Sequence, residues 1–198
     1  MKSVKSVLHS VPDCQAIVKK AIVERLKGVY KKEWFEETGP KYKIEISILN
    51  DIALLTVDTS GAGLHKRGYR ELAVKAPIKE TLACAMLDLS RWKPDRPLLD
   101  PFCGSGTIAI EAAMIGKHIA PGLKREFDFE KWPCCDKNIM KKVRQEAEAQ
   151  VLSDEEAGLR IFASDIDYFA LKQAKKNAEL AGVGGCIHFQ KLDYSKAG

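Results

Sequence analysis

The stretch LLDPFCGSGTIAIEAA, residues 98–113, decides the fold. It predicts a short apolar strand that ends at Asp100, a turn that holds Gly104 and Gly106, and a helix from about Thr107. Glycine at the two turn positions permits positive φ and lets a ligand approach without meeting a Cβ atom. The helix start offers N–H donors and a positive dipole end to a carboxylate or phosphate. With Asp100 able to hold an ammonium group, the stretch predicts a receptor for a zwitterionic amino-acid group beside a nucleoside.

Strand and helix patterns alternate outward from this turn. A helix is predicted from Pro77, and the ranges 97–100, 107–115, 160–164, 168–180 and 186–190 then alternate strand, helix, strand, helix, strand. One extra amphipathic helix is expected near residues 137–151. Such alternation is typical of βαβ units on a parallel sheet. We therefore expect an α/β fold with a Rossmann-like sheet in this part of the chain.

The acid that follows the second strand separates two ligand classes. Residues 104–109 also fit the G-x-G-x-x-A pattern of dinucleotide sites. Such a site, however, requires an acid at a strand end roughly twenty residues later. The acids in that zone lie in FDFEKWP, which is not a strand end, whereas RIFAS ends much later at Asp165. We expect Asp165 to reach ribose hydroxyls and Asp167 to cap the next helix. A nicotinamide-dependent oxidoreductase remains a weaker alternative.

Asp193, at the end of the third strand, has two open interpretations. It can accept a hydrogen bond from an adenine amino group, or it can be an ordinary loop or capping acid. Phe102 is placed either at the ligand pocket or in the core.

The first part of the chain has a different pattern and a different charge. A helix that starts at Ser10, with Pro12 and Asp13 in its first turn, and ends at Gly28 is predicted, followed by a hairpin with strands at 42–48 and 52–58 joined by Asn50-Asp51. Residues 59–75 form a connector with three glycines and a basic cluster. The formal net charge of +5 lies entirely before residue 76. This imbalance suits polyanion binding, although a solvated basic surface explains it equally well.

Several classes of protein and site are not indicated. The N-terminus is too polar for a signal peptide and the chain has no apolar run of eighteen residues, so a cytoplasmic protein without a membrane span is expected. Six cysteines form no C-x-x-C pair, so we expect reduced thiols and no metal site.

The chain resembles a known family in LHKRGYR, APIKETLA, the LLDPFCGSGTIAIEAA block, IAPG, REFDFEKWP and FASDID. It is similar from about residue 8 to its end to the bacterial THUMP-domain methyltransferases that modify guanine amino groups in large-subunit ribosomal RNA. The resemblance implies a class I (Rossmann-like) methyltransferase sheet in residues 76–198, preceded by a linker (59–75) and an α+β remnant of a THUMP RNA-binding domain (1–58). It implies S-adenosylmethionine (SAM) as cofactor and ribosomal RNA as partner. The cofactor-binding residues expected by motif are Lys79, Glu80, Thr81, Asp100, Phe102, Gly104, Gly106, Thr107, Asp165, Ile166 and Asp193.

One motif of that family is absent. Its members carry Asn/Asp-Pro-Pro-Tyr after the fourth strand, where it holds the target amine, and these 198 residues contain neither Asn-Pro-Pro nor Asp-Pro-Pro. We therefore expect a fragment with a partial sheet and name no catalytic residue. A partner chain supplying the missing strands is then expected, since parallel strands need neighbours.

The alternative function is a non-catalytic RNA-binding fragment. Its expected RNA contacts are Lys66, Arg67, Tyr69 and Arg70, with structural salt bridges as the competing interpretation.

Overall fold

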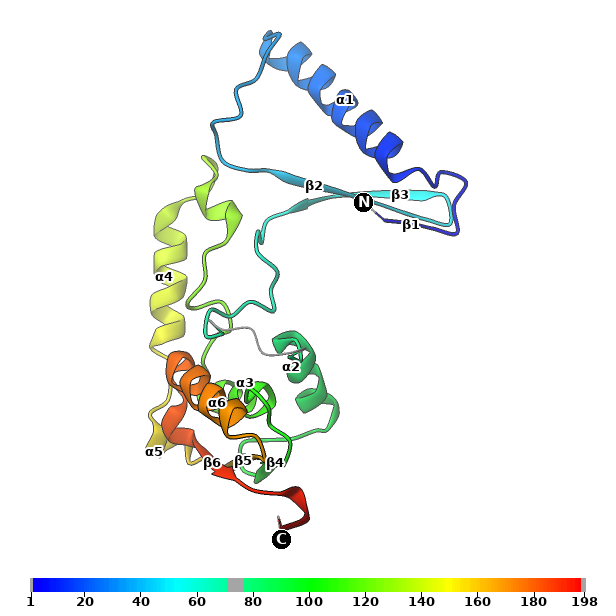
Figure 1. Cartoon of the computed structure of the whole chain (residues 1–198). Helices are drawn as coiled ribbons and strands as arrows, with labels where there is room; N and C mark the ends of the chain where they lie inside the picture. Colours follow the sequence, from blue (N-terminus) through cyan, green and yellow to red (C-terminus); the bar gives the residue numbers. More distant parts are fainter. Residues whose placement is uncertain (1, 71–76, 197–198) are drawn as a thin grey trace. The chain divides into compact units, whose positions relative to one another are not determined.

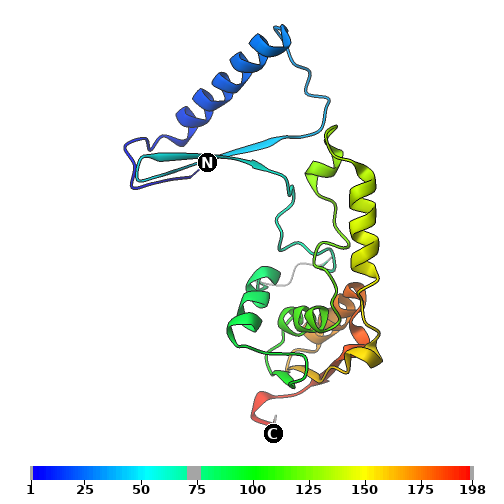
Figure 2. The ribbon, with the colours of Figure 1, turned by 180° about the vertical axis from the view of Figure 1, so that it is seen from behind.

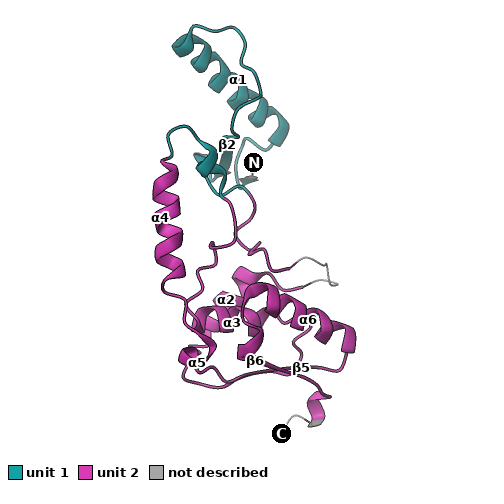
Figure 3. Ribbon diagram, turned by 90° about the vertical axis from the view of Figure 1, so that its left-hand side faces the viewer, with its two compact units in different colours: residues 1–61, 127–135 teal, residues 62–126, 136–198 magenta. Residues whose placement is uncertain are grey.

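The computed structural model describes residues 2–70 and 77–196, and the chain divides into two compact units. Unit 1 comprises Met1–Gly61 and Phe127–Cys135, and unit 2 comprises Ala62–Glu126 and Asp136–Gly198 (Figure 3). The aromatic run FDFEKW therefore packs with the N-terminal elements, although it follows them by more than sixty residues of sequence. The units are described separately below.

Unit 1 is a three-stranded sheet with one helix over it. β1 (Lys2–Val4) pairs parallel with β2 (Lys43–Leu49), which pairs antiparallel with β3 (Ile52–Asp58). Helix α1 (Val11–Tyr30) lies over the face that carries Ile46 and Ile48 (Figure 1). The short helix η1 (Asp128–Lys131) belongs to this unit because Phe129 N–H donates to the Thr59 carbonyl at 3.1 Å and Trp132 stacks on Tyr42 with ring centroids 4.6 Å apart.

The hairpin expected at residues 50–51 is confirmed, the expected end of the helix was wrong, and one strand of unit 1 was not predicted. Asn50 and Asp51 both have positive φ, 49° and 61°, as the twist of a two-residue hairpin turn requires. Helix α1 continues past Gly28 and ends at Tyr30, where Lys31 takes the left-handed conformation with φ 54°. Strand β1 was missed because three residues are too few to show alternation.

Unit 2 is built on a parallel sheet. Strands β4 (Leu98–Asp100), β5 (Ile161–Asp165) and β6 (Ile187–Lys191) pair in that order, so the expected strand–helix alternation and the α/β class are confirmed. Helices α2 (Glu80–Leu89), α3 (Thr107–Gly116) and α6 (Tyr168–Ala181) all lie on one side of it (Figure 2). The unit also contains α4 (Lys137–Glu148), α5 (Asp154–Ala157), η2 (Gly184–Cys186) and η3 (Tyr194–Lys196).

The core of unit 2 fills the space between the sheet and these helices. Ile110 and Ala174 are fully buried, and Ile161 and Ala163 point inward from β5 with exposed fractions of 2% and 1%. The opposite side chains of the sheet are open: Leu99 is 58% exposed and Phe162 44%. The helices thus cover one face of the sheet, and the carboxyl ends of its strands all lie at one edge.

Two absences concern the described residues only. No helix among residues 2–70 and 77–196 has the length and hydropathy of a membrane span. Within the same ranges, no three His, Cys, Asp or Glu side chains gather as a metal site would require.

Candidate functional site

The glycine turn after β4 is fastened to the end of β5. The backbone N–H of Gly104 donates to Asp165 Oδ2 at 2.9 Å, and the N–H of Cys103 donates to the Ser164 carbonyl, also at 2.9 Å. Asp100 stands at the end of β4 and accepts the Phe102 N–H at 3.2 Å. The structure therefore brings Asp100, the turn and Asp165 together at the carboxyl edge of adjacent parallel strands, where ligands bind in open α/β sheets.

The two glycines of the turn have different roles. Gly104 has φ +52°, and a Cβ atom added there would have no heavy atom within 4 Å, so its environment is open. Gly106 has φ +82°, and an added Cβ would lie 3.0 Å from Ala174 Cβ of α6. Gly106 thus permits close packing of α3 against α6, whereas only Gly104 fits the expected role of giving a ligand access to the backbone.

Asp100 and Asp165 have no cationic side chain paired with them in the described part of the chain. Burial raises the pKa of Asp100 above its ordinary 3.8, and the nearby charge of Asp165 raises it further, against the lowering effect of the Phe102 N–H. Among the residues that the structure describes, neither carboxylate forms an ion pair. Two close carboxylates without an ion-pair partner among the described residues favour a cationic ligand group.

The expected helix cap at Asp167 is confirmed, and Asp165 faces the glycine turn. Asp167 is the N-cap of α6 and accepts the Phe169 N–H at 2.8 Å. Asp165 faces the turn with Oδ2 and accepts the Asp167 N–H with Oδ1 at 2.9 Å. These contacts fix the plane of the Asp165 carboxylate beside the turn. Ile166, which follows it, is 66% exposed and available to a ligand.

The segment after β6 lies at the same edge. The Leu192 N–H donates to the Asp165 carbonyl at 3.2 Å, and Asp193 accepts both the N–H and the hydroxyl of Ser195, at 3.0 and 2.9 Å, which lowers the pKa of Asp193. Asp193 is therefore at least a turn-forming acid. Phe102 is 68% exposed, so the core interpretation of this residue was wrong, and its ring lies 5.1 Å from that of Tyr194. Tyr194 was missed by the sequence analysis, although its position directly after Asp193 was a usable signal.

The expected methionine-end residues lie at the start of α2, which begins at Glu80 and not at Pro77. The backbone of Lys79 is extended, with ψ 139°, so Lys79 is the N-cap and only its carbonyl joins the helix. Lys79 and Thr81 are exposed, whereas Glu80 is 3% exposed and pairs with Arg70 at 3.3 Å. Glu80 Oε2 is buried and has no partner among the described residues. Thr107 is also buried, and its hydroxyl accepts from Arg70, so Thr107 offers a ligand its backbone N–H alone.

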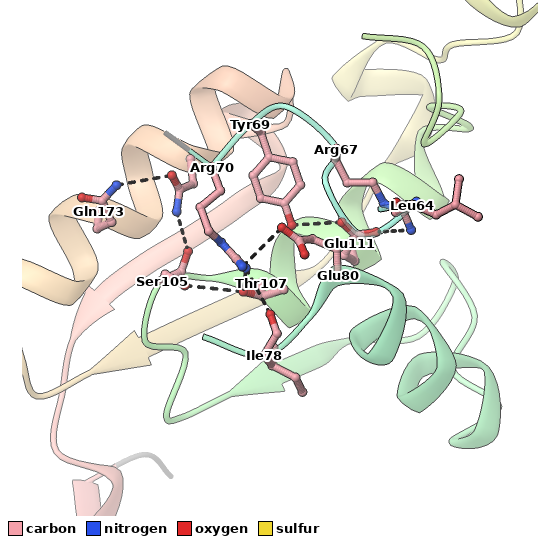
Figure 4. Close-up of polar contacts among 11 residues, drawn as sticks. Leu64, Arg67, Tyr69, Arg70, Ile78, Glu80, Ser105, Thr107, Glu111 and Gln173 are labelled. Atoms are coloured by element: carbon pink, nitrogen blue, oxygen red, sulfur yellow. Dashed lines mark hydrogen bonds and ion pairs between the residues drawn. The ribbon is translucent and has the colours of Figure 1, made fainter. Parts of the chain in front are cut away.

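The expected RNA contacts in LHKRGYR need correction. Tyr69 is 2% exposed and its hydroxyl donates to Glu111 Oε1 at 2.9 Å. The side chains of Arg67 and Arg70 are 9% and 16% exposed, and they pair with the buried carboxylates of Glu111 and Glu80 (Figure 4). Burial against carboxylates argues against phosphate contacts or base stacking by these three side chains. Lys66 alone of the four is exposed.

Comparisons with known proteins agree with this geometry. The RMKL-like methyltransferase domain family (UPF0020) matches residues 67–197, and the THUMP domain family matches residues 1–58. The Bacillus subtilis protein named "Putative RNA methyltransferase YpsC" is 58% identical over 193 residues, which is 96% of this chain and 50% of YpsC.

Two solved structures are similar over nearly the whole chain. One, from Listeria monocytogenes, is described as a predicted N6-adenine-specific DNA methylase; it has TM-score 0.91 and 53% identity, covering 98% of this chain and 51% of that one. The other, SMU.472 complexed with S-adenosylhomocysteine (SAH), has TM-score 0.90 and 45% identity, with 98% and 51% coverage. The chain thus spans about half the length of the relatives it matches. Together with the glycine turn and the acids at the strand ends, these matches show that the chain belongs to the RMKL-like methyltransferase domain family, with a THUMP domain at its N-terminus.

Proposed function

We propose that the glycine turn of unit 2 binds SAM and that the protein serves the methylation of RNA. The observation that carries the proposal is the meeting of Asp100 and Asp165 at the turn, where no described residue forms an ion pair with them. SAM carries an ammonium, a sulfonium and a carboxylate. The positive ammonium suits Asp100, and the carboxylate suits the N–H groups at the start of α3.

The carboxylate, the ammonium and the ribose hydroxyls of the cofactor each have a candidate partner at this edge. The N–H groups that begin α3 can receive the carboxylate, and Asp100 can accept the ammonium. Asp165 can accept the ribose hydroxyls after giving up its contact with Gly104. Ile166 and the pair Phe102–Tyr194 present apolar surface beside these acids. When bound, SAM supplies an electrophilic methyl group, and the described residues hold and orient it.

The acceptor that fits best is an exocyclic purine amine. The resemblance indicates guanine N2 in ribosomal RNA, whereas the Listeria relative is described as acting on adenine N6 of DNA. Both are amines conjugated to a ring and are weak nucleophiles, so the reaction depends mainly on alignment with the methyl group. The THUMP match and the basic N-terminal part favour RNA. For this sequence extended to the length of its relatives, methyl transfer to ribosomal RNA and none to duplex DNA is the expected result; the reverse would overturn the RNA proposal.

Cofactor binding by the 198-residue chain is the first test. Calorimetric titration of one preparation with SAH and with NAD should give saturable binding of SAH and none of NAD. Circular dichroism on the same sample establishes that the chain is folded. A folded chain that binds NAD, or that ignores SAH, contradicts the proposal.

Transfer itself is not expected from these residues. The chain contains no Asn-Pro-Pro or Asp-Pro-Pro sequence to align the target amine, so no residue is named catalytic. With ribosomal RNA and labelled SAM we expect no incorporation above background. Measurable methylation by this chain would show that alignment is achieved by other residues.

RNA binding without chemistry is the second candidate function. The THUMP match and the excess of basic residues before residue 76 favour it. Because Arg67 is buried, a test by substitution should use the exposed Lys66 and leave Arg67 in place. Affinity for structured RNA should fall as the salt concentration rises. In Lys66→Ala the affinity should be lower, and its salt dependence should be reduced by about one phosphate contact.

A further inference from the structure

The guanidinium of Arg70 joins the starts of two helices. Its Nη2 donates to Thr107 Oγ1 at 2.6 Å, on the first residue of α3, and to the Ile78 carbonyl at 3.2 Å. Its Nη1 lies 3.3 Å from Glu80 Oε1, on the first residue of α2. All these groups belong to unit 2 and converge in Figure 4. We call Arg70, Glu80 and Thr107 the clamp.

The position of Arg70 has an electrostatic cost. A cation beside the N-terminus of α3 is repelled by the positive end of the helix dipole, and its burial removes most of its water. The carboxylate of Glu80, 3% exposed, offsets both effects. Buried ion pairs add little net stability compared with apolar residues, so fixed geometry is the better explanation for keeping this one.

The geometry that the clamp fixes is that of the glycine turn. Thr107 directly follows Gly106, whose N–H closes the turn on the Cys103 carbonyl at 2.7 Å. On the other side, the buried Asn177 of α6 donates to the Ser105 carbonyl at 3.1 Å. The turn is therefore anchored through Asn177 from α6 and through Arg70 from the start of α2.

We infer that Arg70 is a positioning residue for the cofactor turn. By holding Thr107 against the start of α2, it keeps the first N–H groups of α3 aimed where the proposed cofactor's carboxylate lies. The inference rests on the proposed binding of SAM. Lysine cannot substitute for arginine here, because a point charge cannot serve Thr107, Ile78 and Glu80 in one plane.

A double-mutant cycle read out as SAH affinity tests this role. The variants are Arg70→Met, Thr107→Val and their combination, with Arg70→Lys as the charge-conserving variant. Titration gives the dissociation constant and the stoichiometry separately, so a partly unfolded sample lowers the second without changing the first. We expect Arg70→Met to weaken SAH binding by about tenfold, Arg70→Lys to recover little, and Thr107→Val to add nothing once Arg70 is gone.

The matched control is Arg67→Met. Arg67 is a second buried arginine, but its partners are the Leu64 carbonyl at 2.9 Å, Cys84 Sγ at 3.6 Å and Glu111 Oε2 at 3.5 Å, none of which belongs to the turn. The Arg67→Met variant should have a lower unfolding temperature and an SAH dissociation constant within about twofold of wild type.

The outcomes separate the two proposals. A folded wild-type chain that does not bind SAH overturns the proposed function. A wild-type chain that binds, with Arg70→Met showing only a lower stoichiometry, reduces Arg70 to a structural residue. Full additivity of Arg70→Met and Thr107→Val also overturns the inference, since the two residues would then act separately.

Discussion

At the scale of single residues, Asp100 combines a cost in folding with a use in binding. Its pKa is raised above 3.8, first by burial and then by Asp165, so the charged form is disfavoured in the folded chain. Between pH 3.8 and the raised value the folded chain holds more protons than the unfolded one, and stability falls as pH rises through that window. Above this pH range Asp100 is fully charged in the folded chain, and the free energy of unfolding is lowered by the full cost of burying that charge.

Asp100→Asn should therefore stabilise the chain and weaken its ligand. The amide keeps an acceptor for the Phe102 N–H but removes the charge. Denaturant titrations should show a gain in the free energy of unfolding at pH 7 that shrinks to nothing below pH 3.8. The SAH dissociation constant should rise by about tenfold or more, as for a lost hydrogen bond to a charged group. A stability gain that persists in acid would show that charge is not its cause.

The two turn glycines provide a second pair of variants. Alanine at either position incurs roughly 1–2 kcal/mol of left-handed backbone strain. Gly106→Ala also forces a Cβ atom to within 3.0 Å of Ala174 Cβ, whereas Gly104→Ala meets nothing within 4 Å. Gly106→Ala should thus lose about 1 kcal/mol or more beyond Gly104→Ala in urea unfolding, the typical effect of overpacking. Equal losses would mean that α6 moves aside freely.

At the scale of elements, the sequence predicts best where local chemistry is decisive. Strand β3 and the cap at Asp167 follow from turn residues and periodicity, and they lie where such patterns put them. Arg67, Tyr69 and Arg70 were misplaced because a basic cluster looks alike on a surface and in a buried network. Their partners Glu80 and Glu111 lie 10 to 44 positions later in the sequence, on α2 and α3. Only the folded packing of these helices brings the two carboxylates to the basic segment.

The capping acid of α6 separates helix stability from ligand binding. Asp167→Ala removes the acceptor for the Phe169 N–H and should cost about 1 kcal/mol of unfolding free energy. Its backbone N–H still donates to Asp165, so SAH affinity should be unchanged. Asp165→Asn is the matched change two residues earlier, and it should weaken SAH with a smaller loss of stability. Calorimetric titration with SAH and thermal unfolding of both variants check that Asp167→Ala mainly lowers stability and that Asp165→Asn mainly lowers SAH affinity.

At the scale of the whole molecule, each unit has a sheet with helices on one face and apolar side chains on the other. In unit 2 the open face carries Leu99 and Phe162, 58% and 44% exposed. In unit 1 the face away from α1 carries Leu49, Ile52 and Leu54, 52%, 74% and 60% exposed. Parallel sheets are normally covered on both faces, and contiguous apolar patches mark surfaces that bind other protein. We therefore predict that these faces associate with other polypeptide.

The 198-residue chain should accordingly self-associate through these faces. Light scattering after gel filtration should give an apparent mass that climbs above 22.0 kDa as concentration rises. Replacing Leu99 and Phe162 by threonine keeps β propensity and should lower the association, and Ile52 and Leu54 replaced in the same way test unit 1. Leu89→Gln is the control, because Leu89 is 82% exposed on α2 and lies outside both sheet faces. A monomer with one cooperative thermal transition at every concentration would contradict this prediction. Both open faces would then be stable in water, and packing on the helix-covered faces would be enough to stabilise the chain.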